Sequence, residues 1–211
     1  KRFRGDWNHR DNAQVAKGML LHSLEVAQSS GLPFFWVGAE EQKGDTFGER
    51  LSQAFQQVFS KGYDNVIAIG DDCPELNREN LIHSAELLAS GQAVVGPAQD
   101  GGVYLIGLSV DHFEASAFDQ LAWTSDQLEL ELQNYLRRFG QMPVCLVVKS
   151  DIDSAEDFKQ LLRRIDKRHF LWKWIKGLFY IPRLQRFLPL LFEHLPFFHP
   201  YYIPRPPPYL I

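Results

Sequence analysis

The run Val66-Ile67-Ala68-Ile69 passes directly into Gly70-Asp71-Asp72-Cys73-Pro74, and this junction constrains the fold more than any other part of the sequence. A short β-branched run that ends at glycine is typical of a buried strand. Ligands bind at the carboxyl ends of strands in open α/β sheets. Two adjacent acids there repel each other, so a divalent cation that holds a phosphorylated substrate would compensate them. The alternative is a turn in which Asp caps the next helix and Pro74 ends the strand.

Helices and strands are expected to alternate along the first three quarters of the chain. The expected helices span 11–29, 47–59, 77–90, 124–139 and a segment from 154, and the expected strands span 33–37, 66–69, 93–95, 103–108 and 144–148. The last two helices are placed by the capping boxes Thr124-x-x-Gln127 and Ser154-x-x-Asp157. This alternation predicts an α/β fold with a mainly parallel, doubly wound sheet and helices on both faces.

Acidic loops follow three of the expected strands, at Gly70–Pro74, Gly96–Gly102 and Ser150–Ser154. Right-handed crossovers bring the loops after successive parallel strands to one edge of the sheet. The paired Gly101 and Gly102 let backbone amides approach a ligand closely. Helix caps and turn glycines account for any one loop alone, but the three together predict a site for a phosphate and a metal ion.

Charge and composition divide the chain near residue 167. Residues 167–211 have seven basic residues and one acid, a net charge of +6, whereas residues 1–166 carry −10. We therefore expect a domain at 1–166 and a basic, aromatic, proline-rich extension at 167–211. The extension is expected to pack on the acidic domain or on a second copy of the chain, or to lie on a membrane surface. Nucleic acid is the least favoured partner.

The cysteines and the apolar runs argue against several other classes. Cys73 and Cys145 are 72 positions apart and form no CxxC motif, so neither a zinc site nor a disulfide framework is indicated. No secretory signal is visible and no uninterrupted apolar run approaches the length of a membrane span. A cytoplasmic location, with peripheral membrane contact as the alternative for the extension, is the expectation.

Five motifs occur in order between residue 48 and residue 157. They are Gly48–Arg50, Gly70–Leu76, Gly96–Leu108, Trp123–Ser125 and Asp151–Asp157. This series resembles a bacterial family of glycosyltransferase-like proteins that is largely uncharacterised. Its members have the GT-A, or nucleotide-diphospho-sugar transferase, fold and are similar to the guanylyltransferases that act on phospholactate and on the molybdenum cofactor. The resemblance extends over residues 1–166.

The resemblance implies roles for the acids and glycines of these loops. Asp72, Asp151 and Asp153 match positions that hold Mg²⁺ or Mn²⁺ in related nucleotidyltransferases. Asp72 is expected at the reaction centre, and Asp100 is expected as an acceptor-side base or orienting group. Gly101 and Gly102 match a loop that lies beside the nucleotide or the acceptor.

Four further residues are expected to contact the nucleotide. Glu49 and Arg50 match a helix start that faces the site, where Arg50 can neutralise phosphate; the alternative for Arg50 is a solvated ion pair. Related enzymes begin with a strand and a glycine-containing basic loop, so the first strand is expected to be missing or to lie upstream of Lys1. Arg2 and Arg4 are then the candidates for phosphate contacts, with a flexible basic terminus as the alternative.

The function implied is that of a metal-dependent glycosyltransferase or nucleotidyltransferase. Its donor is expected to be a nucleotide sugar or a nucleoside triphosphate, and the sequence does not identify the acceptor. The competing hypothesis is a non-catalytic protein of the same fold that acts as a scaffold or regulatory subunit through its extension.

Overall fold

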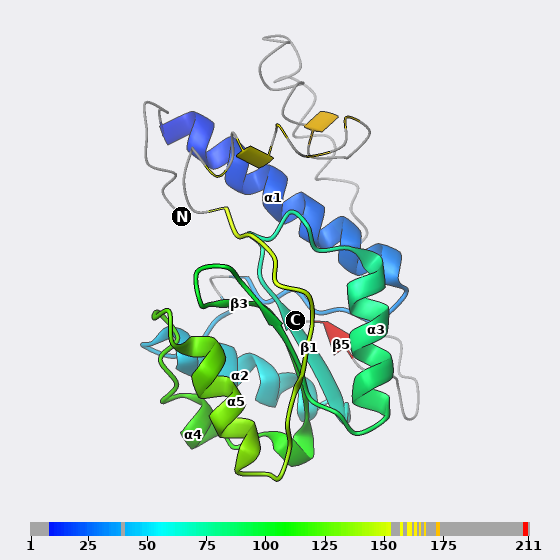
Figure 1. The fold of residues 1–211 in the computed structure, drawn as a ribbon, viewed down its shortest axis with the longest axis vertical. Helices are drawn as coiled ribbons and strands as arrows, with labels where there is room; N and C mark the ends of the chain where they lie inside the picture. Colours follow the sequence, from blue (N-terminus) through cyan, green and yellow to red (C-terminus); the bar gives the residue numbers. More distant parts are fainter. Residues whose placement is uncertain are drawn as a thin grey trace.

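The computed structural model describes residues 9–38 and 41–152, together with positions 157, 160–161, 163, 165, 167, 172–173 and 209–210. One sheet lies between two groups of helices (Figure 1). Its strands are β1 (Asn65–Ile69), β2 (Val94–Pro97), β3 (Val103–Ser109), β4 (Val144–Cys145) and β5 (Tyr209–Leu210), in the order β4-β2-β3-β1-β5. β3 is antiparallel to both neighbours, whereas β4 pairs parallel with β2 and β5 parallel with β1. All strands of this sheet except β3 therefore run in one direction.

The reversal of β3 is the point at which the sheet departs from the doubly wound expectation. Only residues 98–102 separate β2 from β3, and a parallel crossover needs a dozen residues or more. The connection closes instead as a hairpin, in which the Ala98 amide donates to the Gly102 carbonyl at 2.9 Å. The loop between these strands still lies at the carboxyl end of β2, as expected.

Helices cover both faces of the sheet, which confirms the predicted α/β architecture. The helices α1 (His9–Ser30) and α3 (Arg78–Ala89) pack on one face, where α1 crosses the end of α3 (Figure 1). The helices α2 (Phe47–Phe59), α4 (Ala115–Phe118) and α5 (Leu128–Arg137) pack on the other. Along β1, Ile67 belongs to the first core and Val66 and Ala68 to the second, because successive strand residues point to opposite faces.

Several element boundaries differ from the sequence expectation. Residues 33–37 form no regular strand, only a bridge at Phe34, and regular pairing at 144–148 is confined to β4. The helix expected from Thr124 begins at Leu128, and the short α4 and the 3₁₀ turn η1 (Val110–His112) precede it.

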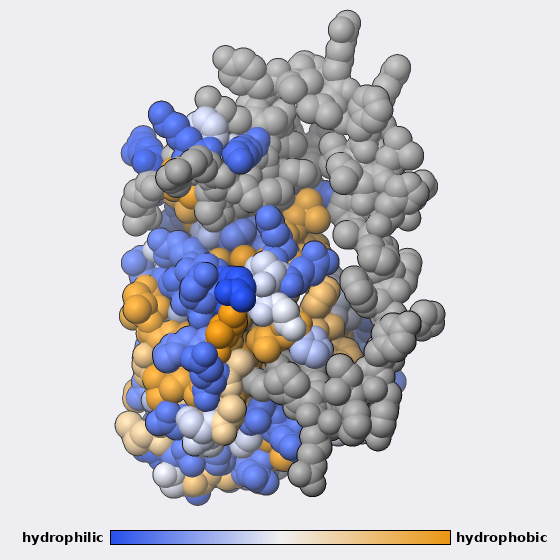
Figure 2. Space-filling view, turned by 90° about the vertical axis from the view of Figure 1, so that its right-hand side faces the viewer, coloured by the Kyte–Doolittle hydropathy of each residue, from blue (hydrophilic) through white to orange (hydrophobic). Residues whose placement is uncertain are grey.

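The predictions for the end of the chain mostly concern residues outside the described ones. These include the helix expected from Ser154 and most of the extension at 167–211, so the partners predicted for the extension stay predictions. Within the described part, no helix is long and apolar enough to cross a bilayer. Figure 2 shows a described surface that is mostly hydrophilic and carries separate hydrophobic patches.

Candidate functional site

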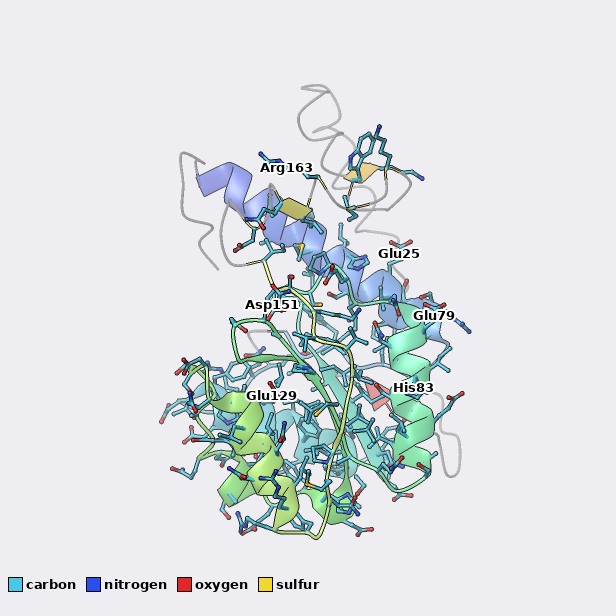
Figure 3. All side chains as sticks on the ribbon, in the orientation of Figure 1. Glu25, Glu79, His83, Glu129, Asp151 and Arg163 are labelled. Atoms are coloured by element: carbon cyan, nitrogen blue, oxygen red, sulfur yellow. The ribbon has the colours of Figure 1, made fainter. Side chains whose placement is uncertain are left out.

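A cavity of about 350 Å³ opens at the end of the sheet where β1 and β2 finish. Its lining comes from the end of β1 and the turn after it, the β2–β3 hairpin, the first half of β3, the start of α2 and the segment that precedes α5. Asp72, Asp100 and Asp151 all line this cavity. Figure 3 shows Asp151 at the end of the sheet nearer to α1. Acids from three separate segments of the sequence therefore line one cavity, and the metal ion that they were expected to hold stays a prediction.

The turn after β1 is shaped around the carboxylate of Asp72. A Cβ atom on Gly70 would lie 2.6 Å from Asp72 Oδ1, so the carboxylate folds back over Gly70 and a side chain there would displace it. The Gly70 amide donates to the Tyr104 carbonyl at 3.0 Å, and the Ser23 hydroxyl donates to the Gly70 carbonyl at 3.4 Å. These bonds join the turn both to β3 and to α1, and so hold the backbone from which the Asp72 side chain extends.

Residues 149–152 connect the three acidic loops directly. The Lys149 amide donates to the Pro97 carbonyl at 3.1 Å, and the Gln99 amide donates to the Lys149 carbonyl at 3.0 Å. On the other side, Lys149 Nζ donates to the Glu75 carbonyl at 3.0 Å and the Ser150 amide donates to Glu75 Oε2 at 3.2 Å. The Ile152 amide then donates to the carbonyl of Asp72 at 3.1 Å. The acids are thus joined through backbone as well as by a shared cavity.

The two glycines of the hairpin have different roles. The Gly102 amide donates to Asp100 Oδ1 at 3.0 Å, and both residues line the cavity. Gly101 has a φ of +86°, and any Cβ there would collide with the backbone oxygen of Asp126. The Glu129 amide donates to the Gly101 carbonyl at 3.2 Å. Gly101 therefore allows the start of α5 to pack on the hairpin, and Gly102 is the glycine that reaches the cavity.

The cavity is acidic. Asp126 joins Asp72, Asp100 and Asp151 in its lining, and no lysine, arginine or histidine of the described residues lines it. A phosphorylated ligand would be repelled here unless a cation accompanied it. Carboxylate oxygens are the ligands that Mg²⁺ prefers, and Mg²⁺ is commonly held by one or two carboxylates together with substrate phosphates.

The described residues do not form a metal site without further ligands. Within the described ranges, no group of three or more His, Cys, Asp or Glu side chains could hold a metal ion by itself. Asp153, the third predicted ligand, lies outside the described residues. A cation at Asp72 and Asp151 would therefore need oxygens from Asp153 or from the substrate, which fits a donor that brings its own phosphates.

The start of α2 faces the cavity, but with other side chains than expected. Glu49 Oε2 accepts from the Asp45 amide at 2.6 Å and from the Thr46 amide at 3.2 Å, which caps the helix. Arg50 Nη1 donates to the Asp45 carbonyl at 3.2 Å. Neither side chain lines the cavity, whereas Phe47 does. Arg2 and Arg4 lie outside the described residues, so their phosphate contacts stay predictions.

Two aromatic side chains line the cavity although the sequence did not identify them as site residues. Phe47 and Trp123, here called the aromatic wall, line the cavity with ring centroids 5.8 Å apart. Phe47 is 49% exposed although it occupies a position of α2 that hydrophobic periodicity assigns to the core. Trp123 belongs to one of the family motifs, but the sequence assigned it no role. Its contribution to the site became evident from its position in the cavity.

The buried thiol and phenol beside the acids are not acid–base groups near neutral pH. Burial raises the pKa of the Cys73 thiol to about 12, and the carboxylate of Asp151 adds to the rise. Burial likewise raises the pKa of Tyr104 above its ordinary value, and its hydroxyl donates to the Val147 carbonyl at 3.0 Å. Among the described residues that line the cavity, the carboxylates are therefore the candidates for a base.

Comparisons with known proteins confirm the resemblance and the fold. Residues 30–125 match the model of a family described as "Uncharacterized protein conserved in bacteria (DUF2064)". The structure is similar to the crystal structure of a putative nucleotide-diphospho-sugar transferase from Desulfovibrio desulfuricans G20, with a TM-score of 0.67 and 24% sequence identity. The match covers 79% of this chain and 84% of that one. None of the curated proteins matches the chain significantly. The fold is thus that of the nucleotide-diphospho-sugar transferases, which is GT-A-like.

Proposed function

We propose that the protein is a metal-dependent transferase that uses a nucleotide sugar or a nucleoside triphosphate as its donor. The observation that carries the proposal is the meeting of Asp72, Asp100 and Asp151 in one cavity of a GT-A-like fold. The absence of basic groups from the described lining supports a donor that arrives with a cation. We place this activity in the cytoplasm, where such donors are made available as soluble metabolites.

The chain's own acids divide into two roles in this proposal. Asp72 and Asp151 would hold Mg²⁺ or Mn²⁺, with Asp153 as the third predicted ligand. Bound there, the ion would neutralise the charge of the donor's phosphates. Asp100, fixed by the bond from the Gly102 amide, would orient the acceptor hydroxyl and take up its proton.

Either donor can transfer a group directly to an acceptor oxygen. In glycosyl transfer, the acceptor oxygen bonds to the anomeric carbon, and the bond from that carbon to the diphosphate oxygen breaks. The nucleoside diphosphate then leaves with the electron pair. In nucleotidyl transfer, the acceptor oxygen bonds to the α-phosphorus and pyrophosphate leaves. Where the acceptor is a hydroxyl, its proton passes to a carboxylate, for which Asp100 is the candidate.

Thermal unfolding with donors and metal ions tests the proposal. The wild-type protein is melted with Mg²⁺ or Mn²⁺ and a panel of UDP, GDP, UDP-glucose, GDP-mannose, GTP and CTP. A ligand present at a hundred times its Kd should raise Tm by about 5 to 10 °C. Asp72→Asn should abolish the part of the shift that needs the metal. Asp111→Asn, which changes an exposed acid outside the cavity lining, should retain it. No metal-dependent shift with any donor would instead favour the non-catalytic scaffold.

A further inference from the structure

We propose that the aromatic wall and the turn after it form a subsite for a neutral sugar ring, so that the group transferred or accepted is a sugar. This rests on the proposed function, and it selects glycosyl transfer over nucleotidyl transfer. The subsite combines Phe47 and Trp123 with Thr124, Ser125 and Asp126, all of which line the cavity.

Trp123 is fixed in place by the protein. Its indole N–H donates to the Phe118 carbonyl at 2.9 Å, and its ring meets the Phe118 ring edge-on with centroids 4.6 Å apart. A Cβ on Gly48 would overlap the indole, so α2 and Trp123 pack in direct contact. Because the ring is held by these contacts, it needs little ordering when a ligand arrives, which favours binding.

Phe47 supplies an apolar face that the protein leaves uncovered. It is half-exposed at the edge of a cavity, where apolar surface in water is unfavourable unless a ligand covers it. Its ring is tilted by 56° from that of Trp123, so the pair does not form the two parallel faces that would sandwich a planar base. One face of a sugar ring carries C–H groups, which suit a single aromatic surface.

The polar rim of the wall suits a ligand that donates hydrogen bonds. Thr124, Ser125, Asp126 and Asp100 all line the cavity, and hydroxyl and carboxylate groups of this kind can accept hydrogen bonds from the hydroxyls of a sugar. The lack of a basic side chain in the described lining disfavours phosphate at the wall itself. Aromatic surface with acidic and hydroxyl oxygens around it is therefore the chemistry of a neutral polyhydroxy ring.

The turn that follows Trp123 contacts the hairpin that carries Asp100. The backbone of Asp126 lies against Gly101, and the Glu129 amide bonds to the Gly101 carbonyl at 3.2 Å. Asp100 is the neighbour of Gly101 in the same hairpin. A ring on the wall would thus lie in the same cavity as the acid proposed to orient the acceptor.

The sugar subsite is tested by comparing the binding of nucleotides with the binding of the corresponding nucleotide sugars. Binding of UDP, UDP-glucose, GDP and GDP-mannose is measured by calorimetry in Mn²⁺ for wild type, Phe47→Ala and the control Trp36→Ala. Trp36 is also exposed, at 54%, but does not line the cavity. Phe47→Ala should weaken the nucleotide sugar about fivefold to tenfold and leave the parent nucleotide unchanged. Trp36→Ala should change neither.

A second measurement separates the donor's sugar from the acceptor's. Saturation-transfer NMR with glucose, mannose and N-acetylglucosamine is recorded on the metal-free protein. A ring signal that Phe47→Ala removes, without a donor effect in the titrations, assigns the wall to the acceptor sugar. The titration effect alone assigns it to the donor.

The outcomes that contradict the subsite differ from those that contradict the transferase. Equal weakening of UDP and UDP-glucose by Phe47→Ala would show that the wall binds the base and would overturn the sugar assignment. No effect of Phe47→Ala in either experiment would overturn it as well. If no nucleotide bound in the presence of metal but the NMR signal of a sugar was still observed, the proposed transferase would be contradicted and the sugar subsite would not.

Discussion

At the scale of single residues, the sequence singled out three of the four acids that line the cavity, but neither Asp126 nor the aromatic wall. Asp72 and Asp151 follow strands that run in the same direction, so their sequence positions alone place them at one edge of the sheet. Phe47 occurs at core spacing on a helix, and its place in the cavity lining beside Trp123 follows only from the tertiary structure. Glu49 was misleading because the first turn of a helix leaves amides that a nearby carboxylate satisfies.

Gly70→Ala should separate metal binding from stability. The added Cβ would meet only the end of the Asp72 side chain, at 2.6 Å, and Gly70 does not have a positive φ. We therefore expect little change in the free energy of unfolding but loss of the metal-dependent Tm shift. Gly91→Ala is the control for adding a Cβ outside the cavity, because nothing lies within 4 Å of the new atom, although its φ of +84° makes alanine strained there. It should cost about 1 kcal/mol and keep the metal response; a full metal response in Gly70→Ala would contradict the placement of Asp72.

The two cysteines should differ in reactivity. Cys73 is buried and its pKa is raised to about 12, mainly by burial, so at pH 8 it is almost wholly a protonated, shielded thiol. Cys145 is exposed, although burial raises its pKa as well. Titration with a chromogenic disulfide should therefore detect one thiol per native chain and two in denaturant. Cys145→Ser should leave none in the native state, and rapid reaction of that variant would show that Cys73 is accessible.

At the scale of elements, helix ends were harder to predict than helices. The sequence favoured a capping box at Thr124-x-x-Gln127, but α5 begins four residues later without a side-chain cap. The formed boxes start α2, at Thr46 and Glu49, and α3, at Asn77 and Asn80. Residues 124–127 instead form the turn that packs on Gly101 and lines the cavity, so tertiary contacts override the local signal.

Thr46→Ala should show which capping box is formed. Thr46 Oγ1 accepts from the Glu49 amide at 3.1 Å, and losing such a cap costs about 1 kcal/mol. Urea denaturation should measure this loss. Thr124→Ala is the matched control, since its side chain is exposed and caps no helix, and it should change stability by less than about 0.5 kcal/mol. Equal losses in the two variants would contradict the assigned start of α5.

At the scale of the whole molecule, the hairpin and residues 149–152 decide how the loops meet. The short link between β2 and β3 already required an antiparallel pair, and this signal in the sequence outweighs the general expectation of parallel crossovers. No sequence pattern revealed the bonds from residues 149–152 to Glu75, Pro97 and Asp72, because they join positions more than fifty residues apart. The convergence of the acids was thus predictable, but the backbone links that hold it were not.

Glu75→Ala should loosen this convergence without unfolding the protein. Glu75 is exposed, and its Oε2 accepts from the Ser150 amide, so the variant removes one link between the turn after β1 and residues 149–152. Hydrogen exchange of the Ser150 and Ile152 amides should become faster. The metal-dependent Tm shift should shrink, because Asp72 and Asp151 would be less well positioned before binding.

Glu75→Gln controls for the loss of the charge at Glu75, and Glu79→Ala controls for the loss of an exposed acid elsewhere on the surface. The glutamine keeps an oxygen that can accept from the Ser150 amide while removing the charge, so it should restore slow exchange. Glu79→Ala removes an exposed acid from the first turn of α3, outside the cavity lining, and should leave both exchange and the metal response unchanged. If Glu75→Ala changed exchange at these amides but not the metal response, the link would be structural only. The preorganisation of Asp151 would then come from other contacts, among them the Ile152 bond to Asp72 and the bonds of Lys149 to Pro97 and Gln99.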